Sequence, residues 1–440
     1  MNISEKFIYH IWDAQHLQPD LITASGKEIK IIFPGRWNNA SGADFKDAVI
    51  EIEGELKRGD VEIHLKTYDW IAHKHQEDSN FNSVILHVVL HNKAQDKFTV
   101  NQAGELIEIL ELVNFLDQSI NKLLKRYQGK KFEAKAEFCL YFAGISSEIT
   151  AKLLAGNGME RLHKKIKRFS AELLFSDFDQ LSYQGIFEAL GYDKNKFQML
   201  QLARTISYNQ IKLWRRQGMQ KEEFMALMIC SSSLREHIPA NIPREIAQKW
   251  LTIYSQQQYF TESLEIDWNL FRLRPVNHPV IRILQVSELI WQAGSNSLFN
   301  KLISLFSFGS AQVDIKEFYR RLYKIFRIEN DLLPDRYVLG KTRIDTITIN
   351  IIIPLALLYA QKLGYQNLES VIEKIYREYH KLPRNYIEKH MHKFMQESQK
   401  RSLSAKAIHQ QGILNLYFEY CKDYNCQLCS EHRQQQISRM

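Results

Sequence analysis

An acid, an imidazole and an ammonium group alternate along the segment VEIHLK, as Glu62, His64 and Lys66. Alternate side chains of a β-strand lie on one face, about 6.6–6.8 Å apart, so these three groups would share a face. Asp44 precedes a second strand-like segment that could pair with this one. Carboxylates from neighbouring strands can hold Mg²⁺ or Mn²⁺, which polarises a phosphate and lowers the pKa of an attacking water. We therefore predict a catalytic site in which Asp44 and Glu62 bind the metal and His64 or Lys66 orients the water.

Four further histidines follow and could enlarge such a site. His73 and His75 are two residues apart, which puts them on different sides of a helix. His87 and His91 would share a strand face but lie about 13 Å apart, too far to bind one ion together. A zinc-dependent hydrolase built on these histidines therefore requires the helix and the strands to converge. The simpler alternatives are a solvated charged face for VEIHLK and hydrogen-bonded histidines in a half-buried sheet.

Short elements must position these groups, because the first part of the chain combines one opening helix with strand-like segments and turns. Ser4 is a suitable N-cap for the opening helix. The strand before His91 is continuously apolar, as in a buried strand. The expected elements are a helix at 4–17, strands at 21–24, 28–35 and 47–56, a turn at 57–60, a strand at 61–66, a helix at 68–76 and a strand at 83–91.

From residue 110 to about residue 420, amphipathic helical segments dominate, for example at 158–175, 221–238 and 280–294. Glycine and proline fall mainly between these segments, where they would end helices. We therefore predict an α+β protein. Its expected domains are a mixed-sheet α/β domain at 1–115, a large all-α domain at 116–415 and a cysteine-rich, metal-binding tail at 416–440.

The N-terminal order of helix, strands, helix and strand, with ADF ahead of VIEIEGELKRGDVEIH, resembles the core of the PD-(D/E)xK nuclease superfamily. In that core an aspartate precedes an acid-x-lysine strand. If Asp44 is the aspartate and Glu62 the acid, His64 occupies the position of the lysine, and Ala43 replaces the usual proline. Glu5 corresponds in position to an additional acid that some members carry. The resemblance implies a restriction-endonuclease-like domain that cuts DNA or RNA.

The whole chain also resembles an uncharacterised bacterial family, domain of unknown function 2851. This resemblance covers nearly the full length and implies no particular activity. It rests on the segments GRWNNASGADFKDAVIEI, GDVEIHLKTYDWIAHKH, NSVILHVVLH and FRLRPVNHPVIR and on the cysteines near the end of the chain.

The segment CKDYNCQLCSEH carries Cys421, Cys426, Cys429 and His432 within twelve residues. Three thiols and an imidazole are ligands of the structural zinc type, and an iron–sulfur cluster is the rival occupant. His432 is the nearest fourth ligand, and Cys139 is the alternative from elsewhere in the chain. Three free surface thiols at a frayed end are the structural alternative.

Positive charge makes nucleic acid the expected partner. The chain has 58 lysines and arginines against 50 aspartates and glutamates, a net charge of +8. Arg272, Arg274 and Arg282 lie around two prolines in FRLRPVNHPVIRI, where their planar guanidinium groups could contact phosphates. The alternative is a structural role, in which these arginines pair with helix acids or cap carbonyls.

Several features indicate a cytoplasmic protein without membrane contact. The opening residues are polar and acidic where a signal peptide would be continuously apolar. The longest apolar run, 347–360, is interrupted by Asn350 and Pro354 and is too short to span a bilayer. The five cysteines, an odd number with three close together, suit a reducing compartment and a metal site.

We therefore predict a metal-dependent nuclease that acts on DNA or RNA phosphodiesters. The alternative is a non-catalytic nucleic-acid-binding or scaffold protein built on a degenerate nuclease core. The missing acid-x-lysine spacing motivates this alternative.

Overall fold

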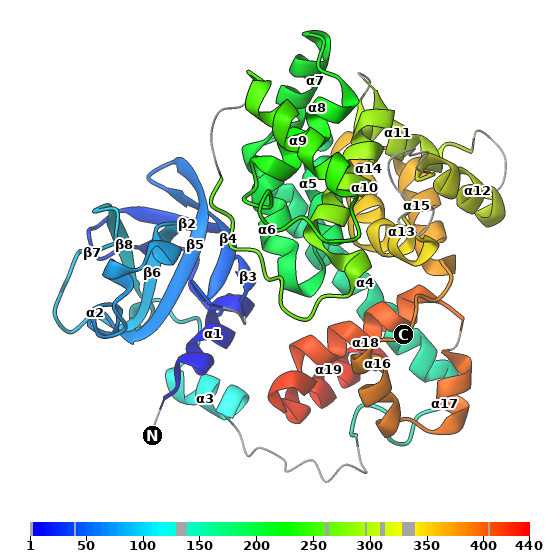
Figure 1. The fold of residues 1–440 in the computed structure, drawn as a ribbon. Coiled ribbons are helices and arrows are strands. Elements are labelled where there is room, and N and C mark those ends of the chain that lie inside the picture. The colour runs from blue at the N-terminus through cyan, green and yellow to red at the C-terminus, as the bar shows by residue number, and fades with distance from the viewer. Residues whose placement is uncertain are drawn as a thin grey trace. The chain divides into compact units, whose positions relative to one another are not determined.

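The chain folds into two compact units, seen in a computed structural model. One unit comprises Met1–Tyr141 with Phe418–Met440, and the other Phe142–Tyr417. The first contains a mixed sheet and the second is helical, which confirms the predicted α+β class (Figure 1). The structure describes residues 3–38, 41–128, 139–259, 264–294, 297–308, 313–327, 339–403 and 405–440.

The sheet of the N-terminal unit has the strand order β1-β2-β4-β5-β6-β8-β7, with β3 paired to β4. β5 and β6 are parallel, as are β6 and β8, and the other neighbours are antiparallel. The strands are β1 (Leu21–Ile22), β2 (Glu28–Phe33), β3 (Arg36–Trp37), β4 (Phe45–Ile52), β5 (Glu55–Lys66), β6 (Val84–His91), β7 (Phe98–Val100) and β8 (Leu106–Glu111). The helices of this unit are α1 (Glu5–Ala14), α2 (Asp69–Ala72), α3 (Ile120–Gln128) and α19 (Cys426–Ser438), with short helices η1 (His75–Glu77), η2 (Ser79–Phe81), η3 (Leu112–Asn114) and η9 (Cys421–Asp423).

The turn between β4 and β5 lies earlier than predicted. Glu53 and Gly54 both have positive φ angles, of 49° and 80°, as a two-residue type I′ hairpin requires. The predicted turn at 57–60 is wrong, because these residues lie inside the twelve-residue strand β5. Gly59 serves close packing there, since a Cβ at this position would lie 2.3 Å from the Ile85 side chain of β6. The glycine indicated a turn but marks a close approach of two strands.

Both faces of the sheet are covered. Val61 and Ile63 of β5 belong to a buried cluster with Phe7 and Ile8 of α1. Glu62 and His64 alternate with them and are also buried. A second, smaller apolar cluster contains Trp70 of α2 together with Ala43, Phe81, Val84 and Ile107. The face that carries Glu62 and His64 is therefore a buried polar face, in place of the solvated one that was the alternative.

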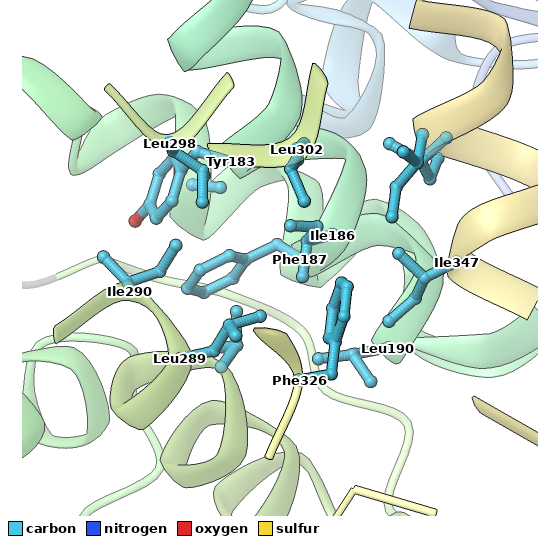
Figure 2. Close-up of a cluster of buried hydrophobic side chains, with 14 of the residues drawn as sticks. Tyr183, Ile186, Phe187, Leu190, Leu289, Ile290, Leu298, Leu302, Phe326 and Ile347 are labelled. Atoms are coloured by element: carbon cyan, nitrogen blue, oxygen red, sulfur yellow. The ribbon is translucent and has the colours of Figure 1, made fainter. Parts of the chain in front are cut away.

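The helical unit has a large apolar core to which most of its helices contribute. Figure 2 shows part of it, where Phe187 of α5 lies among Leu289, Ile290 and Ile186. The helices are α4 (Ser147–Glu172), α5 (Phe178–Leu190), α6 (Tyr192–Thr205), α7 (Tyr208–Arg216), α8 (Lys221–Cys230), α9 (Arg244–Gln256), α10 (Pro279–Ala293), α11 (Leu298–Ile303), α12 (Ile315–Ile325), α13 (Lys341–Ile347), α14 (Ile353–Leu363), α15 (Gln366–Glu378), α16 (Tyr386–Met391), α17 (Glu397–Ser402) and α18 (Ala407–Glu419), with short helices η4 (Pro275–Asn277), η5 (Ser304–Phe306), η7 (Thr348–Ile352) and η8 (His392–Phe394).

The apolar run at 347–360, expected to be too short to span a bilayer, lies within a longer continuous helix. α13, η7 and α14 together span Lys341–Leu363, which by length and composition is sufficient to cross a membrane. In the described part of the chain, 78% of its apolar window is buried inside the protein, so it is a core helix here. The segment η7 is a π-helical turn that ends at Ile352, two residues before Pro354. Such a turn accommodates the missing N–H of proline without ending the helix.

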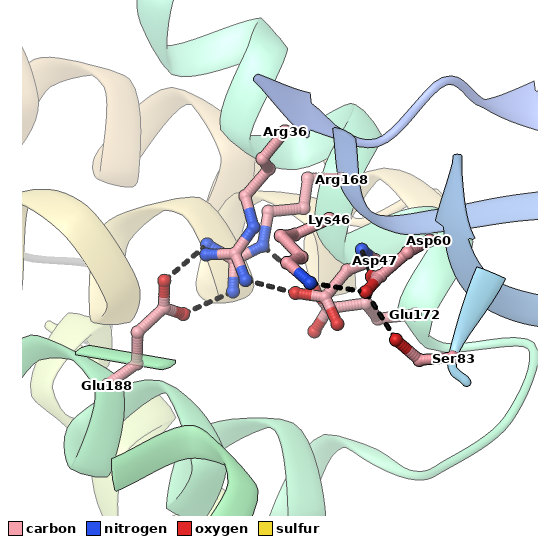
Figure 3. A network of polar contacts seen from close by, with 8 residues as sticks. All are labelled: Arg36, Lys46, Asp47, Asp60, Ser83, Arg168, Glu172 and Glu188. Atoms are coloured by element: carbon pink, nitrogen blue, oxygen red, sulfur yellow. Dashed lines mark hydrogen bonds and ion pairs between the residues drawn. The ribbon is translucent and has the colours of Figure 1, made fainter. Parts of the chain in front are cut away.

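Each unit contains a network of buried polar contacts (Figure 3). In the sheet, the Lys46 ammonium of β4 donates to Asp60 of β5 at 2.6 Å, and the Ser83 hydroxyl donates to the same carboxylate oxygen at 2.5 Å. In the helical unit, Arg168 of α4 contacts both Glu172 and Glu188. These two carboxylates are nearly inaccessible, so Arg168 offsets the cost of burying them.

We expect the substitution Arg168→Leu to destabilise the helical unit by about 3–5 kcal/mol, because it leaves two buried carboxylates without their cation. Urea unfolding followed by circular dichroism measures the change. Arg320→Leu is the matched control, since Arg320 pairs with Glu317 on an exposed helix surface and should have little effect. Equal effects of the two substitutions would contradict the assigned role of Arg168.

Candidate metal site

Four side chains of the N-terminal unit direct donor atoms at one another. Glu62 Oε1 lies 3.2 Å from His75 Nε2 and 3.6 Å from His64 Nε2. His64 Nε2 lies 3.1 Å from His73 Nδ1, and the donor nitrogens of the three histidines all lie within 4.8 Å of one another. Tetrahedral zinc with bonds of about 2.0–2.2 Å holds its ligand atoms about 3.3–3.6 Å apart. The observed spacing is close to that of a metal-binding site.

A break in the helix brings His73 and His75 together. The predicted helix at 68–76 is wrong in extent, because α2 ends after one turn at Ala72. Lys74 then adopts a left-handed conformation with φ of 61°, and His75 begins the short helix η1. The His75 ring stacks on the Phe81 ring, with centroids 3.7 Å apart. The two histidines therefore share a site that a regular helix would not have formed.

Two hydrogen bonds join Asp44 to strand β5, one to the Glu62 side chain and one from the Ile63 backbone. The Asp44 backbone N–H donates to Glu62 Oε2 at 3.0 Å, and the Ile63 backbone N–H donates to Asp44 Oδ2 at 3.0 Å. The Tyr9 hydroxyl of α1 also donates to the Asp44 carboxylate. One oxygen of Glu62 is thus anchored while the other faces the histidines. The structure brings together the predicted residues Asp44, Glu62 and His64.

His87 of β6 orients the His64 ring through a hydrogen bond. His64 Nδ1 and His87 Nε2 are 2.9 Å apart in a hydrogen bond. Burial lowers the pKa of His64 to about 2 and that of His87 to about 3, so both rings are neutral near pH 7. A neutral His64 that donates from Nδ1 presents an unprotonated Nε2 toward Glu62. Histidine ligands of metals are commonly oriented by such a hydrogen bond from the other ring nitrogen.

The carboxyl groups at the site are poorly compensated for their burial. Burial raises the pKa of Glu62 to about 8, and burial together with the nearby Glu62 raises that of Asp44 to about 7. The pKa of Glu5 is also raised by burial, and its carboxyl group interacts electrostatically with His73 and His75. A bound cation would offset the cost of these buried acids. Glu5, noted from its position on the first helix, therefore lies at the site.

The centre is open on one side. His73 is exposed, whereas His64 and His75 are buried. Structural zinc sites use four protein ligands in a closed arrangement, whereas catalytic sites leave a position open to water or substrate. Glu62 and the three histidines would already supply four ligands, so water or substrate entering at the exposed His73 side would be a fifth ligand, an expansion that catalytic zinc can undergo.

Lys66 is placed differently from expectation, and a second lysine, Lys46, lies near Glu62 instead. Lys66 ends β5 with an exposed side chain, and its backbone N–H donates to Asp69. Among the described residues, no hydrogen bond or ion pair joins its ammonium group to Glu62 or His64. Lys46, which sequence reasoning missed, interacts electrostatically with Glu62. The spacing Asp44-Phe45-Lys46 is the sequence feature that could have pointed to it.

The predicted phosphate-binding arginines do not share one environment. Arg282 is buried in α10 and donates hydrogen bonds to Gln285, Tyr192 and Asn277. This placement corresponds to the structural alternative. Arg272 and Arg274 are exposed in the segment leading into η4. These two remain accessible to a ligand.

The cysteine-rich tail belongs to the N-terminal unit. Cys421 lies on η9, and Cys426, Cys429 and His432 lie on α19. Cys429 is buried. The tail is thus folded in the structure, unlike the frayed end that was the alternative.

Comparison with known proteins identifies one family. A family model described as "Protein of unknown function (DUF2851)" matches residues 5–386, most of the chain. No curated protein matches the chain. No solved structure matches it either, so the likeness to a nuclease core is not confirmed by these comparisons.

We expect the full chain to bind one Zn²⁺ at the Glu62–histidine site, measured by titration calorimetry after chelation. His73→Ala together with His75→Ala should abolish this equivalent, because two of the four donors are lost. His91→Ala is the matched control, since His91 lies on β6 outside the group of donors. Unchanged zinc binding in the double variant would exclude the site.

Proposed function

The chain belongs to the DUF2851 family, whose description assigns no activity, and we propose from its own residues that it is a metal-dependent phosphodiesterase acting on nucleic acid. The convergence of Glu62 with His64, His73 and His75 carries this proposal. Acidic and imidazole donors around a partly open centre suit hydrolysis assisted by a metal ion.

The order of elements around the site supports a nuclease-like arrangement. α1 and β2 precede the antiparallel pair β4–β5, and α2 then leads to β6, which is parallel to β5. Asp44 stands directly before β4, while Glu62 and His64 lie on β5. This matches the helix, strands, helix and strand on which the resemblance to PD-(D/E)xK nucleases rests. His64 stands where that core has its lysine.

The donor set determines which ions suit the site. Three imidazoles favour Zn²⁺ over Mg²⁺, while carboxylates such as Glu62 and Asp44 also accept Mn²⁺. A divalent ion bound there would polarise a phosphate and lower the pKa of water. Asp44 holds Glu62 in place through its backbone N–H, and Lys46 supplies positive charge close to the carboxylate.

The distribution of charge supports nucleic acid as the substrate class. Residues 142–417 carry 38 lysines and arginines against 26 aspartates and glutamates, whereas the remaining residues carry 20 against 24. The helical unit thus has a formal net charge of +12 and the N-terminal unit −4. Lysines and arginines that neutralise phosphates supply most of the non-specific affinity for nucleic acid.

An open hollow of about 560 Å³ on the helical unit gathers part of this charge. Lys389 and Lys393 are exposed there, at the end of α16 and on η8. The hollow is suited to the phosphate backbone of a single strand. Its lining residues are Arg384, Lys389, His392, Lys393, Glu397, Lys400 and Arg401.

A second candidate function is binding of nucleic acid without cleavage. The neutral, buried state of His64 favours it, because this residue cannot supply the positive charge of the lysine it replaces. The exposed position of Lys66 also favours binding without cleavage. The two candidates differ in turnover, which is measurable.

We expect the purified chain to cleave labelled single-stranded DNA, duplex DNA or RNA in the presence of Zn²⁺ or Mn²⁺. Glu62→Gln should reduce the rate at least about 100-fold, because the substitution removes a charged donor at the centre. His91→Ala should leave the rate unchanged. Binding without cleavage of any of these substrates by metal-loaded protein would favour the second candidate, and undiminished cleavage by Glu62→Gln would contradict the assigned site.

We expect nucleic-acid affinity to fall steeply with salt. Lys389→Ala with Lys393→Ala should reduce the slope of log K against log salt by about 0.7 for each lost contact to a single strand. Fluorescence anisotropy over a salt series measures the slope. Lys249→Ala with Lys362→Ala is a control of equal charge change at exposed positions outside the hollow. Equal slopes for the two double variants would exclude the hollow as the binding surface.

A further inference from the structure

The thiols of the tail interact with one another. Cys426 and Cys429 lie three residues apart on the first turn of α19 and therefore face the same side. The Cys421 and Cys429 thiols are joined by a hydrogen bond. None of the cysteines forms a disulfide. The Cys421 thiol of η9 thus contacts the buried Cys429 thiol on the side of α19 that also carries Cys426.

The structure distinguishes between the two possible fourth ligands. The Cys139 thiol interacts electrostatically with that of Cys429. The Tyr141 hydroxyl donates to Gln436 of α19 at 2.9 Å, and Arg433 donates to the Leu140 carbonyl. These bonds hold the segment that carries Cys139 against α19.

His432 has a different neighbour. Its ring lies against the Tyr420 ring, with centroids 5.5 Å apart and planes inclined at 31°. The contacts of the Leu140–Tyr141 segment with α19 therefore favour Cys139 over His432 as the fourth ligand.

We propose that Cys139, Cys421, Cys426 and Cys429 form a second metal centre with four thiolate ligands. Soft sulfur donors without a carboxylate select zinc or an iron–sulfur cluster over Mg²⁺ or Ca²⁺. Binding releases one proton from each thiol and involves no change in the oxidation state of sulfur. The sulfur ligands would bind this metal whether or not the protein is a nuclease.

The centre joins parts of the chain that are distant in sequence. Cys139 lies near the end of the first segment of the N-terminal unit, and the other three thiols lie on the segment that returns after the helical unit. A link between such distant segments removes much conformational freedom from the unfolded chain. The metal would therefore link the two segments of the N-terminal unit and stabilise its folded state.

Metal binding at these cysteines would also stabilise the position of α1. Asp423, two residues after Cys421, forms an ion pair with Lys6 of α1. Its Oδ2 atom lies 3.6 Å from Nε2 of His10, which is also on α1. Lys422 lies over the Trp37 ring of β3, 5.0 Å from its centroid. The tail thus packs on the helix that carries Glu5, so loss of the metal should loosen that helix.

The test uses the full chain with His73→Ala and His75→Ala, so that metal at the other site does not contribute. We expect this protein, purified anaerobically, to retain either one zinc or an iron–sulfur cluster. Elemental analysis and the visible absorption of an iron–sulfur cluster distinguish these two. Cys139→Ser and Cys426→Ser should each lose the metal. His432→Ala should retain it, as should Cys230→Ala, a control at a buried cysteine of α8.

Thiol labelling keeps the proposal testable if a serine variant fails to fold. In the protein with native cysteines, chelation should make Cys139, Cys421, Cys426 and Cys429 reactive together toward an alkylating reagent, while Cys230 stays protected. Absence of zinc and iron from the anaerobic protein would overturn the proposal. Loss of metal in His432→Ala with retention in Cys139→Ser would overturn the assignment of the fourth ligand.

Discussion

The paired hydrogen bonds between Asp44 and the strand that carries Glu62 determine the candidate site. They hold the start of β4 against β5 and fix Glu62 Oε2 on a backbone N–H. The remaining oxygen can then face His64 and His75. Without this constraint the Glu62 side chain could adopt other rotamers, in which its free oxygen would not face the imidazoles. The position of Asp44 thus controls the direction in which the free oxygen of Glu62 points.

The surrounding structure makes that geometry rigid. His87 supports His64 from the neighbouring parallel strand, and Phe81 stacks on His75. The Tyr9 hydroxyl connects α1 to Asp44. Supporting contacts of this kind orient metal ligands and set their affinity. The tail, which packs on α1 through Asp423, extends the same support to the end of the chain.

Sequence periodicity was sufficient to predict the part of the site that lies on strand β5. The alternation of Glu62 and His64 with apolar residues predicts one shared face, and Asp44 lies beside it as expected. The positions of His73 and His75 could not be predicted, because they depend on the left-handed conformation of Lys74 and on a helix of a single turn. Propensity favoured a longer helix there, and tertiary packing of Trp70 and His75 determined a shorter one.

The same limits explain the other differences. Gly59 in a charged segment resembles a turn, and only the approach of Ile85 reveals that it is a packing position. The positive φ angles that mark the real turn are at Glu53 and Gly54. Cys139 is distant from the other cysteines in sequence, so only the folded unit places it near Cys429. Long-range contacts, unlike periodicity, leave no local pattern in the sequence.

The most direct test of the central claim is the position of a metal ion in crystals of the full chain grown with Zn²⁺, located by anomalous scattering. The account predicts an ion about 2.0–2.2 Å from Glu62 Oε1 and from the nearest nitrogens of His64, His73 and His75. Zinc that is bound elsewhere, with these four side chains unoccupied, would contradict it.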